Sequence, residues 1–123
     1  MIRTSLALIF LFLTMSAGSA QLVIPRPAKI EEQKGQFTLT ADTVIVAPRS
    51  LSNESETLRR LLQPATGFSL STQTEKSEGN QIMLRLDSSM KKLGPEAYQL
   101  QVVPRGAVIK SSTPAGVFYG IQT

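Results

Sequence analysis

The chain has 123 residues, no cysteine, no histidine and a formal charge of +4 at pH 7. The lack of cysteine excludes disulfides and thiolate metal sites, and the lack of histidine excludes Ser-His-Asp or Cys-His nucleophiles and histidine zinc sites. Lys and Arg are dispersed along the sequence and are not interleaved with aromatic residues. The composition therefore gives no indication of nucleic-acid binding. Carboxylate chemistry, lysine chemistry or no chemistry at all remains for this chain.

The first 20 residues have the pattern of a secretory signal peptide. Arg3 precedes an apolar run from Leu6 to Met15, and the small residues 17–20 follow it. The run reaches about half of the roughly 20 residues that span a bilayer, which argues against a membrane anchor. We expect cleavage after Ala20, a periplasmic or secreted product comprising residues 21–123, and no membrane association of that product.

The next residues predict an extended segment followed by two strands. Pro25 and Pro27 favour extended backbone over helix. Over residues 36–40 apolar and polar side chains alternate, which predicts a first strand. Residues 43–47 form a β-branched run that ends at a proline, which predicts a second and more buried strand.

Residues 50–63 predict an amphipathic helix. Ser52 or Asn53 can cap it, three leucines (Leu58, Leu61, Leu62) follow at helical spacing, and Pro64 with Gly67 should end it. The charged residues of this segment lie on the other face, so we expect the helix to cover one face of a sheet.

Four more strands are predicted after this helix, over residues 68–71, 82–87, 98–103 and 107–110. The last two are separated by a tight Pro-Arg-Gly connection, which predicts an antiparallel hairpin. Residues 88–96 read as a polar loop. This order of elements predicts an α+β domain: a largely antiparallel sheet with helices packed on one face.

The final eleven residues predict the start of a second helix. Thr113 suits the N-cap and Pro114 the first helical position. Val117, Phe118 and Ile121 are expected to share one face, and no capping glycine or basic last turn follows them. We therefore expect the sequence to be the front part of a longer protein.

No group of residues predicts a catalytic or phosphate-binding site. Glu31 and Glu32 are adjacent in an extended segment and point opposite ways, whereas an acid and a base must face each other across a substrate bond. No lysine lies inside an apolar run that would lower its pKa. The spacing of Gly116 and Gly120 is best explained by close packing of a helix backbone, because no phosphate-loop motif is present. We predict no catalytic residue, no metal site and no cofactor.

Three stretches of the sequence together carry a family resemblance. They are residues 23–28 with 35–39 and 43–46, then residues 93–100, and finally residues 111–123. The most specific is the run Ala-Gly-Val-Phe-Tyr-Gly-Ile-Gln-Thr that begins at Ala115. Together they resemble the N-terminal, non-catalytic domain of bacterial β-N-acetylhexosaminidases of glycoside hydrolase family 20.

The resemblance implies a parent enzyme that removes terminal N-acetylhexosamine residues from glycans, with the acetamido group of the substrate acting as nucleophile. It also implies an Asp-Glu pair on a catalytic barrel, and no Asp-Glu dipeptide occurs in this sequence. No catalytic residue can therefore be transferred, and this chain alone is not expected to be active.

The resulting interpretation is an accessory domain that supports the barrel of an exported hexosaminidase. The candidate docking residues are Val117, Phe118, Tyr119 and Ile121, and the expected partner is the catalytic barrel of the same protein, with glycan bound only through that barrel. Two alternatives stay open: the N-terminal domain of another glycosidase, such as a family 84 hexosaminidase, or a stand-alone exported glycan-binding module.

Overall fold

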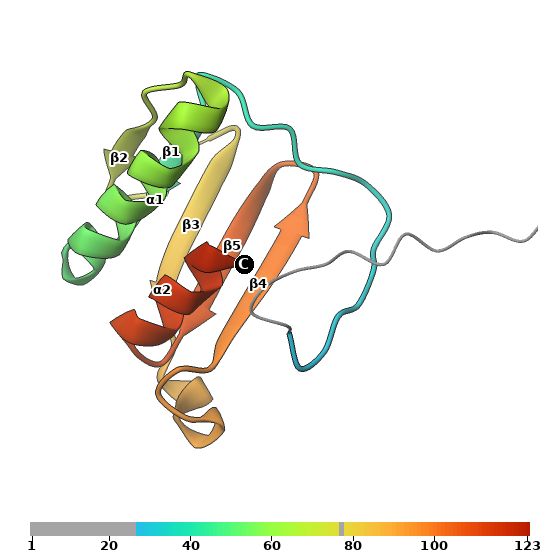
Figure 1. Cartoon of the computed structure of the whole chain (residues 1–123), viewed down its shortest axis with the longest axis vertical. Helices are drawn as coiled ribbons and strands as arrows, with labels where there is room; N and C mark the ends of the chain where they lie inside the picture. Colours follow the sequence, from blue (N-terminus) through green and yellow to red (C-terminus); the bar gives the residue numbers. More distant parts are fainter. Residues whose placement is uncertain (1–26, 77) are drawn as a thin grey trace, which may run out of the picture.

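The computed structural model describes residues 27–76 and 78–123, which form a five-stranded sheet and two α-helices (Figure 1). In chain order the elements are β1 (Val44–Val46), α1 (Ser52–Thr66), β2 (Ser71–Gln73), β3 (Gln81–Leu86), β4 (Tyr98–Val103), β5 (Gly106–Ser111) and α2 (Pro114–Gln122). The predicted signal peptide lies outside the described residues.

The sheet is mixed and mostly parallel, so the prediction of a largely antiparallel sheet is wrong. The strand order is β2-β1-β3-β5-β4. The first three pairings across this order are parallel, and only the β4–β5 hairpin is antiparallel. The hairpin was predicted correctly because its tight turn fixes the direction of both strands.

The parallel pairings depend on connections whose direction the sequence does not encode. The helix α1 carries the chain from β1 back to the parallel neighbour β2, as a helical crossover does. The described residues between Gln73 and Gln81 form no helix, but β1 and β2 are only three residues long. A few extended residues at roughly 3.3–3.6 Å each can span so short a strand. The chain can thus return from the end of β2 to the end of the sheet where β1 starts, and β3 runs parallel to β1.

Both helices lie on the same face of the sheet, as predicted (Figure 1). Under them the side chains of alternate strand residues form the core, which includes the fully buried Ile45 and Leu84 together with Ile82 and Ile109. Val117 of α2 is also fully buried against this cluster. The period-2 alternation of β3 and β5 thus places one set of side chains under the helices and the other on the uncovered face.

The helix α1 begins differently from the prediction, whereas its end at Gly67 was predicted, although Pro64 does not stop it. A 3₁₀ turn, Arg49–Leu51, leads directly into it, and the N-cap residue Leu51 gives no side-chain hydrogen bond. Neither of the predicted caps is used. At the other end Pro64 lies within the last turn, and the helix ends at Gly67, whose φ of 72° is left-handed and whose N–H donates to the Gln63 carbonyl.

Two predicted strands are displaced or missing. Residues 36–40 form no strand; Phe37 and Leu39 pack instead as partly buried side chains against the core. The strand predicted at 68–71 begins only at Ser71, because Phe68 and Leu70 turn inward before it. In both places the alternation reflects contact with the core and not pairing in a sheet.

The segment predicted as a polar loop between β3 and β4 contains a 3₁₀ helix, Ser88–Leu93. Asp87 caps it by accepting a 3.0 Å hydrogen bond from the Ser89 N–H. The hydroxyl of Ser89 donates to the same carboxylate. These two hydrogen bonds hold the pKa of Asp87 below its ordinary value, and the bond from the Ser89 side chain has the larger effect. Met90 is buried on the inner side of the turn.

Truncating the core leucine of β3 should cost far more stability than truncating an exposed one. Leu84 is 1% exposed and Leu93 is 69% exposed. We expect Leu84→Ala to lower the free energy of unfolding by about 2–5 kcal/mol, because it leaves a cavity under the helices. Leu93→Ala makes the same chemical change in solvent and should be nearly neutral. Equal shifts of the two midpoints in urea unfolding would contradict this placement of the core.

Candidate functional site

The candidate site is the surface of α2, and its position is fixed by the cap at its start. Thr113 has extended backbone, and its hydroxyl accepts a 3.1 Å hydrogen bond from the Gly116 N–H, as predicted for an N-cap. The same hydroxyl donates to the carbonyl of Pro95. The cap therefore also ties the start of α2 to the segment that leads into β4.

Two glycines bring α2 very close to the sheet. A Cβ added at Gly116 would lie 1.9 Å from the Ser111 Oγ and 2.7 Å from the Ala97 carbonyl oxygen. A Cβ at Gly120 would lie 2.5 Å from the Ile109 Cγ2 and 3.2 Å from the Tyr98 ring. Only glycine fits at either position, which confirms that this spacing serves close packing.

The four predicted docking residues have different environments. Val117 is 0% exposed and packs within the domain, so it has no surface to offer a partner. Ile121 is partly buried against the core. Phe118 and Tyr119 are 41% and 37% exposed, and their rings meet edge to face with centroids 5.9 Å apart. The surface that α2 presents to solvent is thus made mainly by these two aromatic side chains.

The end of α2 is held against β4. The Tyr98 hydroxyl and the Thr123 Oγ1 are 2.5 Å apart, and the Thr123 hydroxyl also lies within hydrogen-bond distance of the Tyr119 carbonyl. Beneath the start of the helix, the buried Ser111 hydroxyl donates to the Ala97 carbonyl. Both ends of the helix are therefore fixed by polar contacts, which holds Phe118 and Tyr119 in one orientation.

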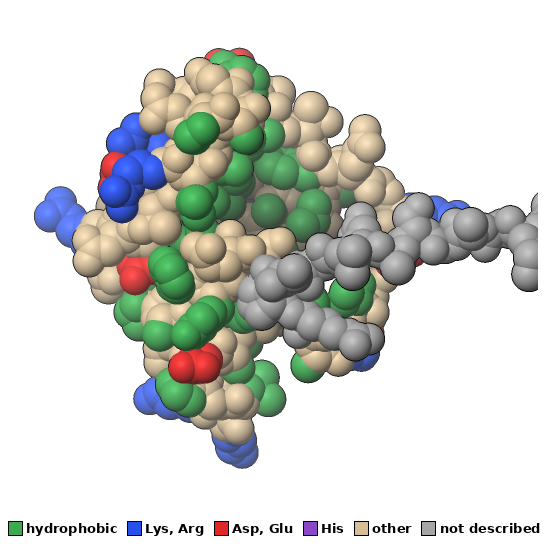
Figure 2. All heavy atoms as spheres, viewed as in Figure 1, with side chains coloured by type: hydrophobic (Ala, Val, Ile, Leu, Met, Phe, Trp, Pro, Cys, Tyr) green, Lys and Arg blue, Asp and Glu red, His purple; other side chains and the backbone are tan. Residues whose placement is uncertain are grey.

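Further apolar side chains surround α2 that were not predicted as part of the site. Figure 2 shows hydrophobic side chains gathered on the helix-bearing face, with a hollow between the two helices. Leu100 and Val102 of β4 are exposed and stand in register with Ile109 and Ala107, so they face the same side as the helices. Leu61 of α1 is also exposed. Strand alternation identified the face of Leu100 and Val102, but it could not reveal that the nine-residue α2 leaves them uncovered.

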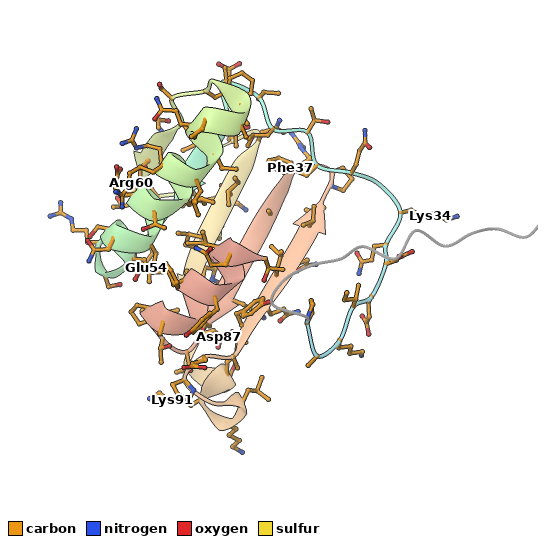
Figure 3. The ribbon with its side chains drawn as sticks, in the orientation of Figure 1. Lys34, Phe37, Glu54, Arg60, Asp87 and Lys91 are labelled. Atoms are coloured by element: carbon orange, nitrogen blue, oxygen red, sulfur yellow. The ribbon has the colours of Figure 1, made fainter. Side chains whose placement is uncertain are left out.

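Phe37 lies near the ends of β4 and β5 (Figure 3), close to this hollow. Nearby, a Cβ added at Gly35 would be 3.0 Å from the Cγ of Pro104, so the segment before β1 passes beside the β4–β5 turn. The amide of Asn80 donates to the Thr38 carbonyl at 3.2 Å and anchors the same segment.

The ion pairs of the described residues belong to separate segments and form no cluster. Glu31 pairs with Lys29 at 2.5 Å in an exposed segment, as expected for a solvated charged stretch. On α1, Arg59 donates two hydrogen bonds to Glu56; these lower the pKa of that carboxyl and raise the pKa of the guanidinium. Among the residues that the structure describes, no three His, Cys, Asp or Glu side chains group as a metal site would require.

Neither described helix combines the length and the apolar character that crossing a membrane would require. The described surface has two helices on a mixed sheet, with aromatic side chains exposed on the shorter helix. The family model for domain 2 of glycosyl hydrolase family 20 matches residues 20–123. The chain therefore belongs to this family, and the alternative of a family 84 domain is set aside.

Curated relatives come from the same group of enzymes. The chain is 30% identical over 103 residues to a beta-hexosaminidase of Porphyromonas gingivalis, covering 82% of this chain and 13% of that protein. It is 28% identical over 114 residues to a lacto-N-biosidase of Bifidobacterium bifidum, covering 87% of this chain and 10% of that protein. The chain thus spans only a small part of either relative.

Solved structures show the same fold within larger enzymes. The family 20 β-N-acetylhexosaminidase of Streptomyces coelicolor superposes with a TM-score of 0.71 and 31% identity, over 80% of this chain and 20% of that one. The N-acetyl-β-hexosaminidase of Streptomyces plicatus gives a TM-score of 0.68 and 30% identity, over 80% and 19%. The described domain corresponds to about a fifth of each enzyme.

Replacing either packing glycine by alanine should destabilise the domain. We expect Gly116→Ala and Gly120→Ala each to lower the free energy of unfolding by about 1–3 kcal/mol through overpacking, which exceeds the gain of up to about 1 kcal/mol from helix propensity. Gly116→Ala should cost more, because one obstacle there is a backbone carbonyl. Gln122→Ala, at an exposed position of the same helix, is the control. A stabilised Gly116→Ala protein in urea unfolding would contradict the close approach.

Proposed function

We propose that this chain is the accessory domain of an exported β-N-acetylhexosaminidase and that it docks against the catalytic barrel through α2. The observation that carries the proposal is the exposed Phe118–Tyr119 pair on a helix that is otherwise packed into the domain. The family match and the much greater length of the relatives support a catalytic domain in the same protein.

The energetics of α2 favour a partner for this surface. Fully burying a large apolar side chain contributes about 1.5–3 kcal/mol, and each ring still has more than a third of its surface to bury. The neighbouring Leu100 and Val102 can extend the contact. Val117 and Ile121 contribute indirectly, because they pack against the core and so hold the helix that carries the two rings.

The proposed reaction belongs to the whole protein and not to this domain. The relatives, a beta-hexosaminidase and a lacto-N-biosidase, support hydrolysis of glycans by the whole protein. Since both kinds of enzyme carry a domain similar to this one, we infer that specificity lies in the catalytic domain. The pattern of residues 1–20 supports export to the periplasm or beyond.

Charging the docking surface should weaken the two-domain protein more than the single domain. In a protein that carries the catalytic barrel, we expect Phe118→Asp to lower the melting temperature by several degrees and to reduce activity, because a desolvated carboxylate would face the barrel. The matched control is Leu93→Asp, which places the same charge at an exposed leucine of the 3₁₀ helix. Unchanged melting and activity in Phe118→Asp would overturn the docking proposal.

The alternative of a stand-alone glycan-binding module has a direct test. The rings of Phe118 and Tyr119 are inclined at 73°, so they form no flat platform on which two sugar rings could lie side by side. Binding of N-acetylhexosamine oligosaccharides by this chain alone, lost in Phe118→Ala, would favour the module. The gene sequence after the codon for Thr123 is the complementary test: an in-frame Asp-Glu pair within a strand-helix repeat supports the hexosaminidase.

A further inference from the structure

The face of the sheet opposite the helices carries a continuous apolar stripe. Val46, Met83 and Val108 stand in register on three neighbouring parallel strands. Their chain neighbours Ile45 and Ile82 lie under the helices, so alternation directs the stripe to the other side. Neither α1 nor α2 covers this face (Figure 1).

Two shallow hollows of about 490 and 510 Å³ run across this face. Both are lined by Lys76 and Met83, so they form one depression, which we call the basic groove. Arg85 lines the first hollow, and Arg105 lines the second. The two arginines are separated by about five strand residues, or roughly 16 Å.

The groove holds the excess positive charge of the domain. Its lining includes three cations, Lys76, Arg85 and Arg105, and one carboxylate, Glu78. All nine carboxylates of the sequence fall within residues 27–123, whereas Arg3 and Arg26 fall outside, so the described residues carry eleven cations against nine anions. The groove alone accounts for this excess of two, and the rest of the described surface is balanced.

The arginines of the groove, like Lys34, Arg49, Lys91 and Lys92, form no ion pair among the described residues. Among the described residues, neither Arg85 nor Arg105 forms an ion pair within 4.0 Å, whereas Arg59, Arg60 and Lys110 do. Arg85 also stands in register with Lys110 on the adjacent strand. Like charges at paired positions repel each other; the Asp87 carboxylate, 3.8 Å from the Lys110 Nζ, attracts both cations.

We propose that the basic groove binds an acidic polysaccharide. Carboxylate or sulfate groups of the polymer would accept paired hydrogen bonds from the N–H groups of Arg85 and Arg105. The planar guanidinium group of arginine matches the geometry of such anions. The sugar rings between the charged groups would lie on Met83 and Val108, which are partly exposed, whereas Val46 beside them is buried. A groove that is open, long and charged at both ends fits an extended polymer.

The choice of a glycan as the polyanion rests on the proposed function, because the chain belongs to a family of glycan-cleaving enzymes. The groove would then hold a charged part of the substrate, or a neighbouring acidic polymer, on the side of the domain away from α2. Its contribution would be retention of the enzyme on acidic glycan, not catalysis.

The test compares dextran sulfate and polygalacturonate with neutral dextran as ligands of the full chain. Calorimetric titration at about 50 mM and 150 mM salt should show binding of an acidic polymer that weakens as salt rises, and no binding of dextran. The triple variant Lys76→Gln, Arg85→Gln, Arg105→Gln should weaken binding at least about tenfold, since it removes three charge-assisted contacts.

The matched control is Arg60→Gln, Lys91→Gln, Lys92→Gln, which removes the same charge at exposed positions outside the groove; Arg60 and Lys91 are seen on the helix-bearing side in Figure 3. It should change affinity less than about twofold. Equal losses of affinity in the groove triple variant and the control triple variant, or no preference for acidic polymers over dextran, would overturn the proposal. Groove-dependent binding of phosphatidylglycerol vesicles without binding of either acidic glycan would also overturn it.

The proposal for the basic groove and the proposal for the docking surface can be tested independently. Circular dichroism in urea should give both triples the midpoint of the unmodified chain, because all six side chains are exposed. Phe118→Asp should leave binding of the acidic polymer intact, whereas the groove triple should leave the melting temperature of the two-domain protein intact. Loss of polymer binding in Phe118→Asp would show that the groove does not exist as a separate site.

Discussion

The close approach of α2 to the hairpin is the contact on which the rest of the structure depends. It requires the missing side chains of Gly116 and Gly120, because Ser111, Ile109 and Tyr98 occupy the space where a Cβ would lie. With the helix backbone held this near, Val117 enters the core and the adjoining Phe118 is turned outward. One packing constraint therefore closes the core and creates the exposed aromatic surface.

The parts of the fold that were predicted from the sequence are those whose signal is local. The Thr113 cap, the β4–β5 hairpin and the helix α1 each depend on residues a few positions apart. The direction of β1, β2 and β3 was not predicted, because it follows from long-range pairing in the sheet that no short pattern records. The extended run around Phe37 shows the converse error, since its alternation arises from packing against the core without any strand.

The helix that carries the candidate docking residues was predicted, but the exposure of each of its side chains was not. Helical spacing groups Val117 with Phe118 and Ile121, yet only the position of the sheet decides which of them is buried. Leu100 and Val102 were assigned to the correct strand, but their exposure depends on where α2 stops covering β4. The pattern of a single element identifies a face, and the tertiary structure determines how much of that face remains free.

The two faces of the sheet are chemically distinct, and this difference limits what each can do. The helix-bearing face exposes aromatic and aliphatic side chains, which gain most from burial against another folded domain. The opposite face combines an apolar stripe with unpaired arginines, and burying those charges against a protein without anionic partners would be costly. A domain that packs against a barrel by its helices therefore keeps its basic groove in solvent, where a flexible acidic polymer can reach it and where salt can weaken the contact.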